Sequence, residues 1–216
     1  MLFINIFISV ARGKTLMRSF MNEELSKFTL HGSVLDIGGG KNPSYLKYFK
    51  KDDSMVRTVV DVDKDISQNR VRDLEKDALP WNGESFDSVL MLNFLEHIYN
   101  YHHVLREARR VIRSGGELIG FVPFFMNVHP DPHDYFRYTK EALYRIFIEA
   151  GFRDVLIKTV GIGPLSVAFN VANSFIPGFI TVLVLPFVYA LDSLLLILRP
   201  EYKDRYPLGY IFKLIK

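Results

Sequence analysis

Short apolar runs, rich in β-branched residues, alternate along the chain with longer segments in which apolar positions follow a helical period. A continuous apolar run bounded by turn residues is typical of a strand that a parallel sheet buries on both faces. Segments of this kind are predicted at residues 33–37, 56–62, 85–91, 117–122 and 155–160. Strands that alternate with helices predict an α/β fold with a doubly wound sheet.

The last third of the chain departs from this alternation. No charged residue occurs from Val160 to Leu191, and we expect residues 161–200 to form an apolar helical insertion before a final strand over residues 206–216. A single membrane crossing would leave that strand on the wrong side of the bilayer. We therefore expect a shallow helical hairpin with peripheral membrane contact through residues 161–198. Basic residues flank this segment on both sides: Arg153, Lys158, Arg199, Lys203 and Arg205. The alternatives are a homodimer interface and a cap folded over the sheet.

Residues 1–30 are predicted to be helical and to belong, with the rest of the chain, to a single domain over residues 1–216. Asn22 is of a residue type that caps helix N-termini, and it predicts a short helix over residues 23–28. The apolar stretch over residues 1–10 is too short to span a bilayer, and no basic segment precedes it. We expect an amphipathic first helix packed on the domain rather than a membrane anchor.

A glycine cluster follows the first predicted strand and precedes a predicted helix over residues 43–50. Gly38, Gly39 and Gly40 allow a ligand to approach the backbone, and Pro43 suits the first position of a helix. A strand, a glycine turn and a helix N-terminus form the nucleotide-type site of doubly wound folds. Pro43 stands where the dinucleotide fingerprint needs its last glycine, so a nicotinamide or flavin dinucleotide is disfavoured.

The second predicted strand ends in Asp61-Val62-Asp63. An acidic residue about 20 positions beyond such a glycine turn accepts hydrogen bonds from ribose hydroxyls. Asp63 follows the last apolar residue of the strand, and we choose it over Asp61 for this role.

Several further motifs follow in order: Asp36-x-Gly38-x-Gly40, Asp77-Ala78-Leu79-Pro80 ahead of Ser85-Phe86-Asp87, Leu95-Glu96-His97, and Ser114-Gly115-Gly116. Together they resemble the class I S-adenosylmethionine-dependent methyltransferases, in the small-molecule, type 11-like branch. The resemblance extends from Val34 to about Phe152. It implies a Rossmann-like seven-stranded sheet in the order 3-2-1-4-5-7-6, with the last strand antiparallel.

The same resemblance implies S-adenosyl-L-methionine as the cofactor. Its binding residues would be Asp36, Gly38, Gly39, Gly40, Asp63, Asp77, Ala78 and Asn93. In this family pattern Asp77 accepts from the adenine amino group, the Ala78 backbone lies at the ring edge, and Asn93 belongs to the turn under the methionine moiety.

The densest polar segment is the loop over residues 129–139, which we interpret as a substrate lid at the carboxyl edge of the sheet. Its candidate substrate-binding residues are Asp134, Tyr135, Arg137 and Tyr138. If the acceptor is a hydroxyl, the base is one of His97, His129 and His133, and the sequence leaves that choice open. His129, His133 and Asp134 offer no firm metal-ligand spacing, and Asn93 stands where related quinone O-methyltransferases carry an acidic metal-binding residue, so we expect no metal.

Composition narrows the remaining possibilities. The 216 residues include no cysteine, which excludes disulfides and thiolate chemistry and fits a cytoplasmic location. The net charge is +3, and no basic, aromatic-interleaved run predicts nucleic-acid binding. We expect methyl transfer from S-adenosylmethionine to a small or lipid-linked acceptor, at the cytoplasmic membrane surface. The alternative is a non-catalytic S-adenosylmethionine-binding or partner-recruiting protein of the same fold.

Overall fold

A six-stranded sheet forms the centre of the computed structural model, which describes residues 2–61 and 73–216. Its spatial order is β4-β2-β5-β6-β8-β7. The strands are β2 (Ser33–Ile37), β4 (Val56–Val60), β5 (Phe86–Leu92), β6 (Ile112–Pro123), β7 (Asp154–Val160) and β8 (Gly209–Ile215). β4, β2, β5 and β6 are parallel, while β8 runs antiparallel to both β6 and β7. The doubly wound α/β fold and its antiparallel last strand are therefore confirmed.

The observed order corresponds to positions 2-1-4-5-7-6 of the expected seven. In the sequence, the expected third strand would lie between β4 and β5. That stretch includes residues 62–72, which the structure does not describe.

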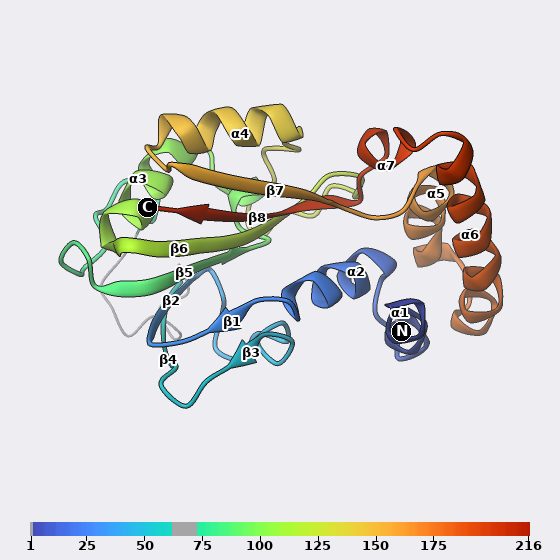
Figure 1. Cartoon of the computed structure of the whole chain (residues 1–216), viewed down its shortest axis with the longest axis horizontal. Helices are drawn as coiled ribbons and strands as arrows, with labels where there is room; N and C mark the ends of the chain where they lie inside the picture. Colours follow the sequence, from blue (N-terminus) through green and yellow to red (C-terminus); the bar gives the residue numbers. More distant parts are fainter. Residues whose placement is uncertain (1, 62–72) are drawn as a thin grey trace.

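Alternate side chains of the strands enter two apolar cores, as the period of two in a strand requires. Leu35 and Ile37 of β2 face the core under α3 (Tyr101–Val111) and α4 (Lys140–Glu149). Val34 faces the core under α1 (Leu2–Ala11) and α2 (Leu16–Leu25). Figure 1 shows α3 and α4 on one side of the sheet and α2 on the other.

The predicted helix over residues 43–50 is wrong, because these residues form successive turns. Their backbone bonds join residues three apart, from Leu46 N–H to Pro43 and from Tyr48 N–H to Tyr45. Phe49 is buried in the core under α2, and Lys50–Lys51 forms the short strand β3, which pairs with β1 (Thr29–Leu30). Tertiary packing of the segment thus replaces its helical propensity.

The predicted cap at Asn22 is also wrong. Thr15 caps α2 instead, because its hydroxyl accepts from Arg18 N–H at 3.2 Å. Asn22 consequently lies inside α2. By contrast, Thr139 caps α4 as its sequence position predicts, since its hydroxyl accepts from Ala142 N–H at 3.2 Å.

Residues beyond β7 form α5 (Pro164–Ala172), a 3₁₀ turn η2 (Asn173–Phe175), α6 (Gly178–Leu198) and α7 (Tyr202–Arg205). These helices lie past the end of the sheet where β6 and β7 finish, with α1 close to them (Figure 1). Among the described helices, α6 is long and apolar enough to cross a membrane by length and composition. Only 17% of its most apolar window is buried.

Candidate functional site

The glycine turn leaves β2 with a backbone that needs glycine. Gly38 and Gly40 have φ values of 72° and 64°, in the left-handed region that L side chains rarely adopt. Gly38 N–H donates to Val60 O at 2.8 Å, and a Cβ on Gly38 would lie 2.4 Å from the Phe94 ring. The turn is therefore held against β4 with Phe94 packed over it.

Asp36 supports this turn from below. Its buried carboxylate accepts from the Tyr45 hydroxyl at 2.7 Å and from Arg57 Nε at 2.8 Å. Arg57 Nη2 donates in turn to Gly40 O at 2.7 Å. A Cβ on Gly39 would collide with the Asp36 carboxylate at 2.2 Å. Asp36 and Gly39 thus fix the shape of the turn and do not line the cleft beside it.

That cleft lies at the carboxyl ends of β2, β4 and β5 and has a volume of about 240 Å³. It is lined by Gly38, Asp61, Asp73, Leu74, Glu75, Asn93, Phe94, His97, Ile98, Asp131, Pro132 and His133. Four of these residues carry carboxyl groups, and the described lining contains no lysine or arginine. The cleft therefore suits a ligand with donors and positive charge rather than a phosphate chain.

The predicted cofactor residues occupy different places. Gly38 and Asn93 line the cleft. Asp61 lines it too and accepts from Gly40 N–H at 3.0 Å, whereas Asp63 lies outside the described residues. Asp77 accepts from Asp73 N–H at 3.0 Å, and neither Asp77 nor the exposed Ala78 is among the described lining residues.

Sequence reasoning missed Asp73, Leu74 and Glu75, which enter the cleft in place of Asp77 and Ala78. An apolar residue between two acids, just ahead of the Leu79-Pro80 pair, was the available signal. The choice between the two groups depends on the backbone, because Asp77 N–H bonds back to Asp73 O at 2.8 Å and the turn directs the earlier residues inward.

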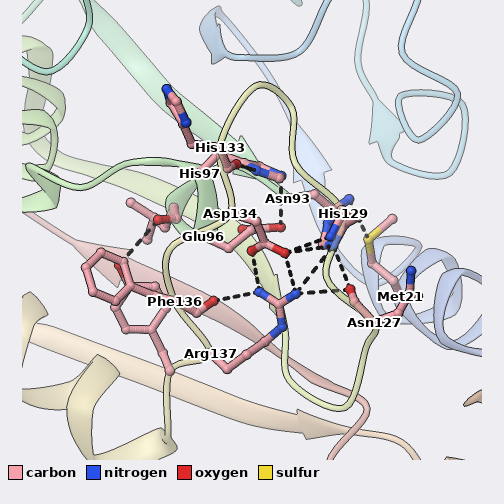
Figure 2. A network of polar contacts seen from close by, with 12 residues as sticks. Met21, Asn93, Glu96, His97, Asn127, His129, His133, Asp134, Phe136 and Arg137 are labelled. Atoms are coloured by element: carbon pink, nitrogen blue, oxygen red, sulfur yellow. Dashed lines mark hydrogen bonds and ion pairs between the residues drawn. The ribbon is translucent and has the colours of Figure 1, made fainter.

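Asn93 connects the cleft to the N-terminal helices. Its backbone has a φ of 52°, and its N–H donates to Phe121 O at 2.9 Å. The side-chain amide lies 4.0 Å from the sulfur of Met21 on α2 (Figure 2). The side-chain amide of Asn93 therefore lies between the cleft and α2.

Glu96 and His97 follow in the 3₁₀ turn η1 (Leu95–His97). Glu96 is fully buried, and among the described residues neither carboxylate oxygen has a hydrogen-bond partner. Burial raises the pKa of Glu96 to about 8. The ring nitrogen Nδ1 of His97 lies 2.5 Å from His133 O. A carbonyl only accepts, so Nδ1 carries the proton and Nε2, 3.8 Å from Glu96 Oε1, has the lone pair.

The loop over residues 129–139 is fixed by an ion pair. Arg137 binds both carboxylate oxygens of Asp134, at 2.5 and 2.7 Å, and this pairing keeps the pKa of Asp134 well below its usual range. Asp134 also accepts from His129 N–H at 2.8 Å, and Arg137 reaches Asn127 O at 3.1 Å. Figure 2 shows this network beside Glu96. Asp134 and Arg137 therefore hold the loop rather than face the cleft.

The two tyrosines of the loop differ in exposure. Tyr138 is buried, its hydroxyl donates to Leu95 O at 3.3 Å, and burial raises its pKa. Tyr135 is 42% exposed and contacts the rings of Tyr99 and His133. Of the four predicted substrate residues, Tyr135 thus has the most accessible side chain, next to His133 of the cleft.

The three candidate histidines come together, although they are far apart in sequence. The His97 and His129 rings pack edge to face with centroids 5.1 Å apart, and His97 and His133 both line the cleft. Ligand atoms of Glu96, His97 and His129 lie within 4.8 Å of one another, so this trio could hold a cation. The group considered from the sequence was His129, His133 and Asp134. It differs from this trio, and in the structure Asp134 is already paired with Arg137.

Comparison with known proteins agrees with this geometry. Residues 35–120 match the model of a methyltransferase domain. The chain is 32% identical over 146 residues to 2-methyl-6-phytyl-1,4-hydroquinone methyltransferase 1 of Oryza sativa, covering 61% of this chain and 44% of that protein. It is 31% identical over 98 residues to 27-O-demethylrifamycin SV methyltransferase of Amycolatopsis mediterranei, covering 39% of this chain and 36% of that protein. The chain thus spans less than half of each curated relative.

A solved methyltransferase from Archaeoglobus fulgidus has the same fold, with a TM-score of 0.56 and 16% identity over 92% of this chain and 94% of that one. Together with the turn after β2 and the acidic cleft, the match over residues 35–120 identifies a methyltransferase domain in this chain, and the whole fold resembles that of a solved S-adenosylmethionine-dependent methyltransferase.

Proposed function

We propose that this chain transfers the methyl group of S-adenosylmethionine to a hydroxyl of a small or lipid-linked acceptor at a membrane surface. The observation that carries the cofactor assignment is the charge of the cleft, where Asp61, Asp73 and Glu75 face apolar Leu74 and Phe94. Carboxylates suit ribose hydroxyls and ammonium groups, and the apolar side chains suit the faces of an adenine ring. When bound, this cofactor supplies an electrophilic methyl group on a sulfonium centre.

Within the cleft, Asp61 and Asp73 would hold donor groups of the cofactor. Asp61 is oriented by its bond from Gly40 N–H, so its position depends on the glycine turn. Phe94 packs against Gly38 and closes the cleft on that side. The residues present therefore fit the cofactor that the family uses.

His97 is the residue best placed to take the proton of an acceptor hydroxyl. It lines the cleft, and its Nδ1–H bond to His133 O leaves Nε2 as the basic nitrogen. Glu96 lies 3.8 Å from Nε2, and above its raised pKa of about 8 its ionised carboxylate would stabilise the imidazolium that forms. The Asp134–Arg137 pair would keep the loop over this pair and limit access of water.

The outer face of α6 supports the membrane contact. Large apolar side chains are exposed along it, including Phe179 (69%), Leu183 (66%) and Phe187 (70%). The polar residues of this region point inward instead. Asp192 accepts from two N–H groups at the start of α5, and Thr181 donates to Asn173 at 2.7 Å. Such a face is stable against lipid, and the alternative occupant is a second copy of the chain.

Calorimetric titration with S-adenosylhomocysteine tests the cofactor assignment. We expect micromolar binding by the wild type, weakening of about 10-fold to 100-fold in Asp73→Asn from loss of a charged acceptor, and no change in Asp154→Asn, an exposed aspartate on β7. Absence of binding by folded wild-type protein would contradict the proposal and favour a partner-recruiting role.

The proposed base has a separate test. His97→Gln should retain S-adenosylhomocysteine affinity but lose transfer of labelled methyl to a membrane-lipid extract, since Gln cannot take the proton. Full transfer by this variant would assign the base elsewhere.

Vesicle flotation tests the membrane contact. Leu183→Ser combined with Phe187→Ser should abolish flotation with liposomes, because both side chains are exposed on α6. Leu156→Ser removes a comparably exposed apolar side chain (61%) from the edge strand β7 and should have no effect. If the wild type does not float, and sediments as a dimer that the α6 variants disrupt, this face is a subunit interface.

A further inference from the structure

Two side chains on α2 carry buried polar atoms without hydrogen-bond partners among the described residues, and neither residue lines the cofactor cleft. Asn22 is 3% exposed, and within residues 2–61 and 73–216 neither atom of its side-chain amide has a hydrogen-bond partner. The Nη1 atom of Arg18, one helical turn earlier, is buried and unpartnered in the same described part of the chain. Of the two, Asn22 lines a cleft, whereas Arg18 lies near Tyr45 and Tyr48.

Such groups are unfavourable for stability. A buried donor or acceptor without a partner costs about 1–3 kcal/mol, and a charged one costs more. Burial lowers the pKa of Arg18, and its neighbours Tyr45 and Tyr48 oppose that effect only in part. An apolar residue at either position would remove this cost. The buried amide of Asn22, which lines a cleft, is therefore better explained by a ligand than by the fold.

A cleft of about 600 Å³ lies at this place, between α1, α2 and the turns around Tyr48. Asn22 lines it, together with the cationic residues Arg12, Lys14 and Lys47. Glu23 is the one carboxylate in its described lining, and it accepts from Asn5 Nδ2 at 3.2 Å. The lining thus carries three cations and one anion, opposite in sign to the cofactor cleft.

These groups select a compact oxyanion. Guanidinium and ammonium groups donate strongly to phosphate oxygens, and the amide of Asn22 can donate to a phosphate oxygen and accept from an ester hydroxyl. The cleft also adjoins apolar surface. Ile8 of α1 lines it, and the ring of Phe3 on α1 packs 4.5 Å from Tyr189 of α6.

We propose that this cleft between α1 and α2 is a binding site for a phosphate group, carried by a lipid headgroup or by a soluble phosphate ester. Asn22 supplies its buried polar group, and Arg12, Lys14 and Lys47 supply its positive charge. The site is distinct from the cleft beside the glycine turn, and it requires neither methyl transfer nor membrane binding. Because Ile8 lies in the cleft and α1 packs on α6, a lipid phosphate is the expected source.

The soluble arm of the test uses sn-glycerol 3-phosphate as the probe and thermal unfolding as the measurement, against sodium chloride at equal ionic strength. The probe should raise the Tm of the wild type. Asn22→Leu should melt no lower than the wild type without the probe, because it removes an unpartnered buried group, and both Asn22→Leu and Lys47→Met should bind the probe at least tenfold more weakly. Arg106→Met, an exposed arginine on α3, should keep the full shift.

The lipid arm compares flotation with phosphatidylcholine vesicles that contain or lack phosphatidic acid. A lipid source predicts that phosphatidic acid increases binding of the wild type but not of Asn22→Leu, whereas a soluble source predicts a thermal shift without this increase. If the wild type shows no thermal shift and no effect of phosphatidic acid, the proposal is overturned. A loss of stability in Asn22→Leu with unchanged probe binding in both variants would also overturn it, because that result would assign Asn22 a structural role.

Discussion

The parallel strands and α6 distribute polar and apolar side chains in opposite ways. Apart from Asp36 and Ser88, the buried side chains of β2, β5 and β6 are apolar, and polar groups gather at the carboxyl edge around the cleft. In α6 most of the large apolar side chains are exposed, while Asp192 and Thr181 are buried together with Leu185. The first arrangement suits water outside the protein, and the second suits an apolar partner. A buried carboxylate therefore has different consequences in the two regions, which substitution can measure.

The largest effect is expected at Glu96, in the cleft region. Its pKa is raised by burial to about 8 from an ordinary value of 4.5, so the folded state retains a proton that the unfolded state releases. Below about pH 4.5 Glu96 is protonated in both the folded and the unfolded state, so its raised pKa does not lower the free energy of unfolding. Between about pH 4.5 and 8 the wild type loses stability as pH rises, by up to about 5 kcal/mol at 1.36 kcal/mol per pKa unit.

Glu96→Gln removes this titration. Urea unfolding at several pH values should show the stability of the variant rising relative to the wild type from pH 4.5 to 8 and then levelling. A pH-independent difference between the two proteins would mean that Glu96 is paired in solution.

The second largest effect is expected at Asp36, the buried carboxylate under the glycine turn. Asp36→Ala leaves Arg57 and the Tyr45 hydroxyl without their shared partner, which should lower the free energy of unfolding by about 3–5 kcal/mol. Chemical denaturation measures this change. Asp154→Ala, at an exposed position of β7, should remain within about 0.5 kcal/mol of the wild type.

A smaller effect is expected at Asp192, the buried carboxylate of α6. Its oxygens accept from Leu165 N–H at 3.0 Å and from Ser166 N–H at 2.7 Å, so it acts as a helix cap supplied by another helix. Asp192→Ala should cost about 2 kcal/mol. Ser193→Ala is the matched neighbour, because the Ser193 hydroxyl bonds within its own helix to Tyr189 O, and it should cost less.

The smallest change in stability is expected on the outer face of α6. Leu183→Ser and Phe187→Ser should alter the free energy of unfolding of the vesicle-free protein by no more than about 0.5 kcal/mol, since both side chains are exposed. Urea unfolding of the protein alone measures this. A large loss of stability would show that these side chains are covered by protein, as in a dimer.

Most of the fold followed from the sequence because its signals are local. Residues 33–37 were predicted as a strand with the observed bounds. The helix expected over residues 43–50 failed because Tyr45 and Phe49 are anchored in buried positions that turns can reach. The Asn22 cap failed because Thr15 starts the helix earlier.

The sequence by itself determined the α/β alternation, the glycine turn and the apolar length of α6, because each of these is written in consecutive residues. The tertiary structure decided which carboxylates face the cleft and which support it. Asp36 meets Arg57 21 positions away, and Asp192 meets α5 26 and 27 positions away. It also placed His129 beside Glu96 and His97, and Asn22 beside a cationic cleft. Such pairings depend on how distant strands and helices pack, and no local pattern of residues encodes them.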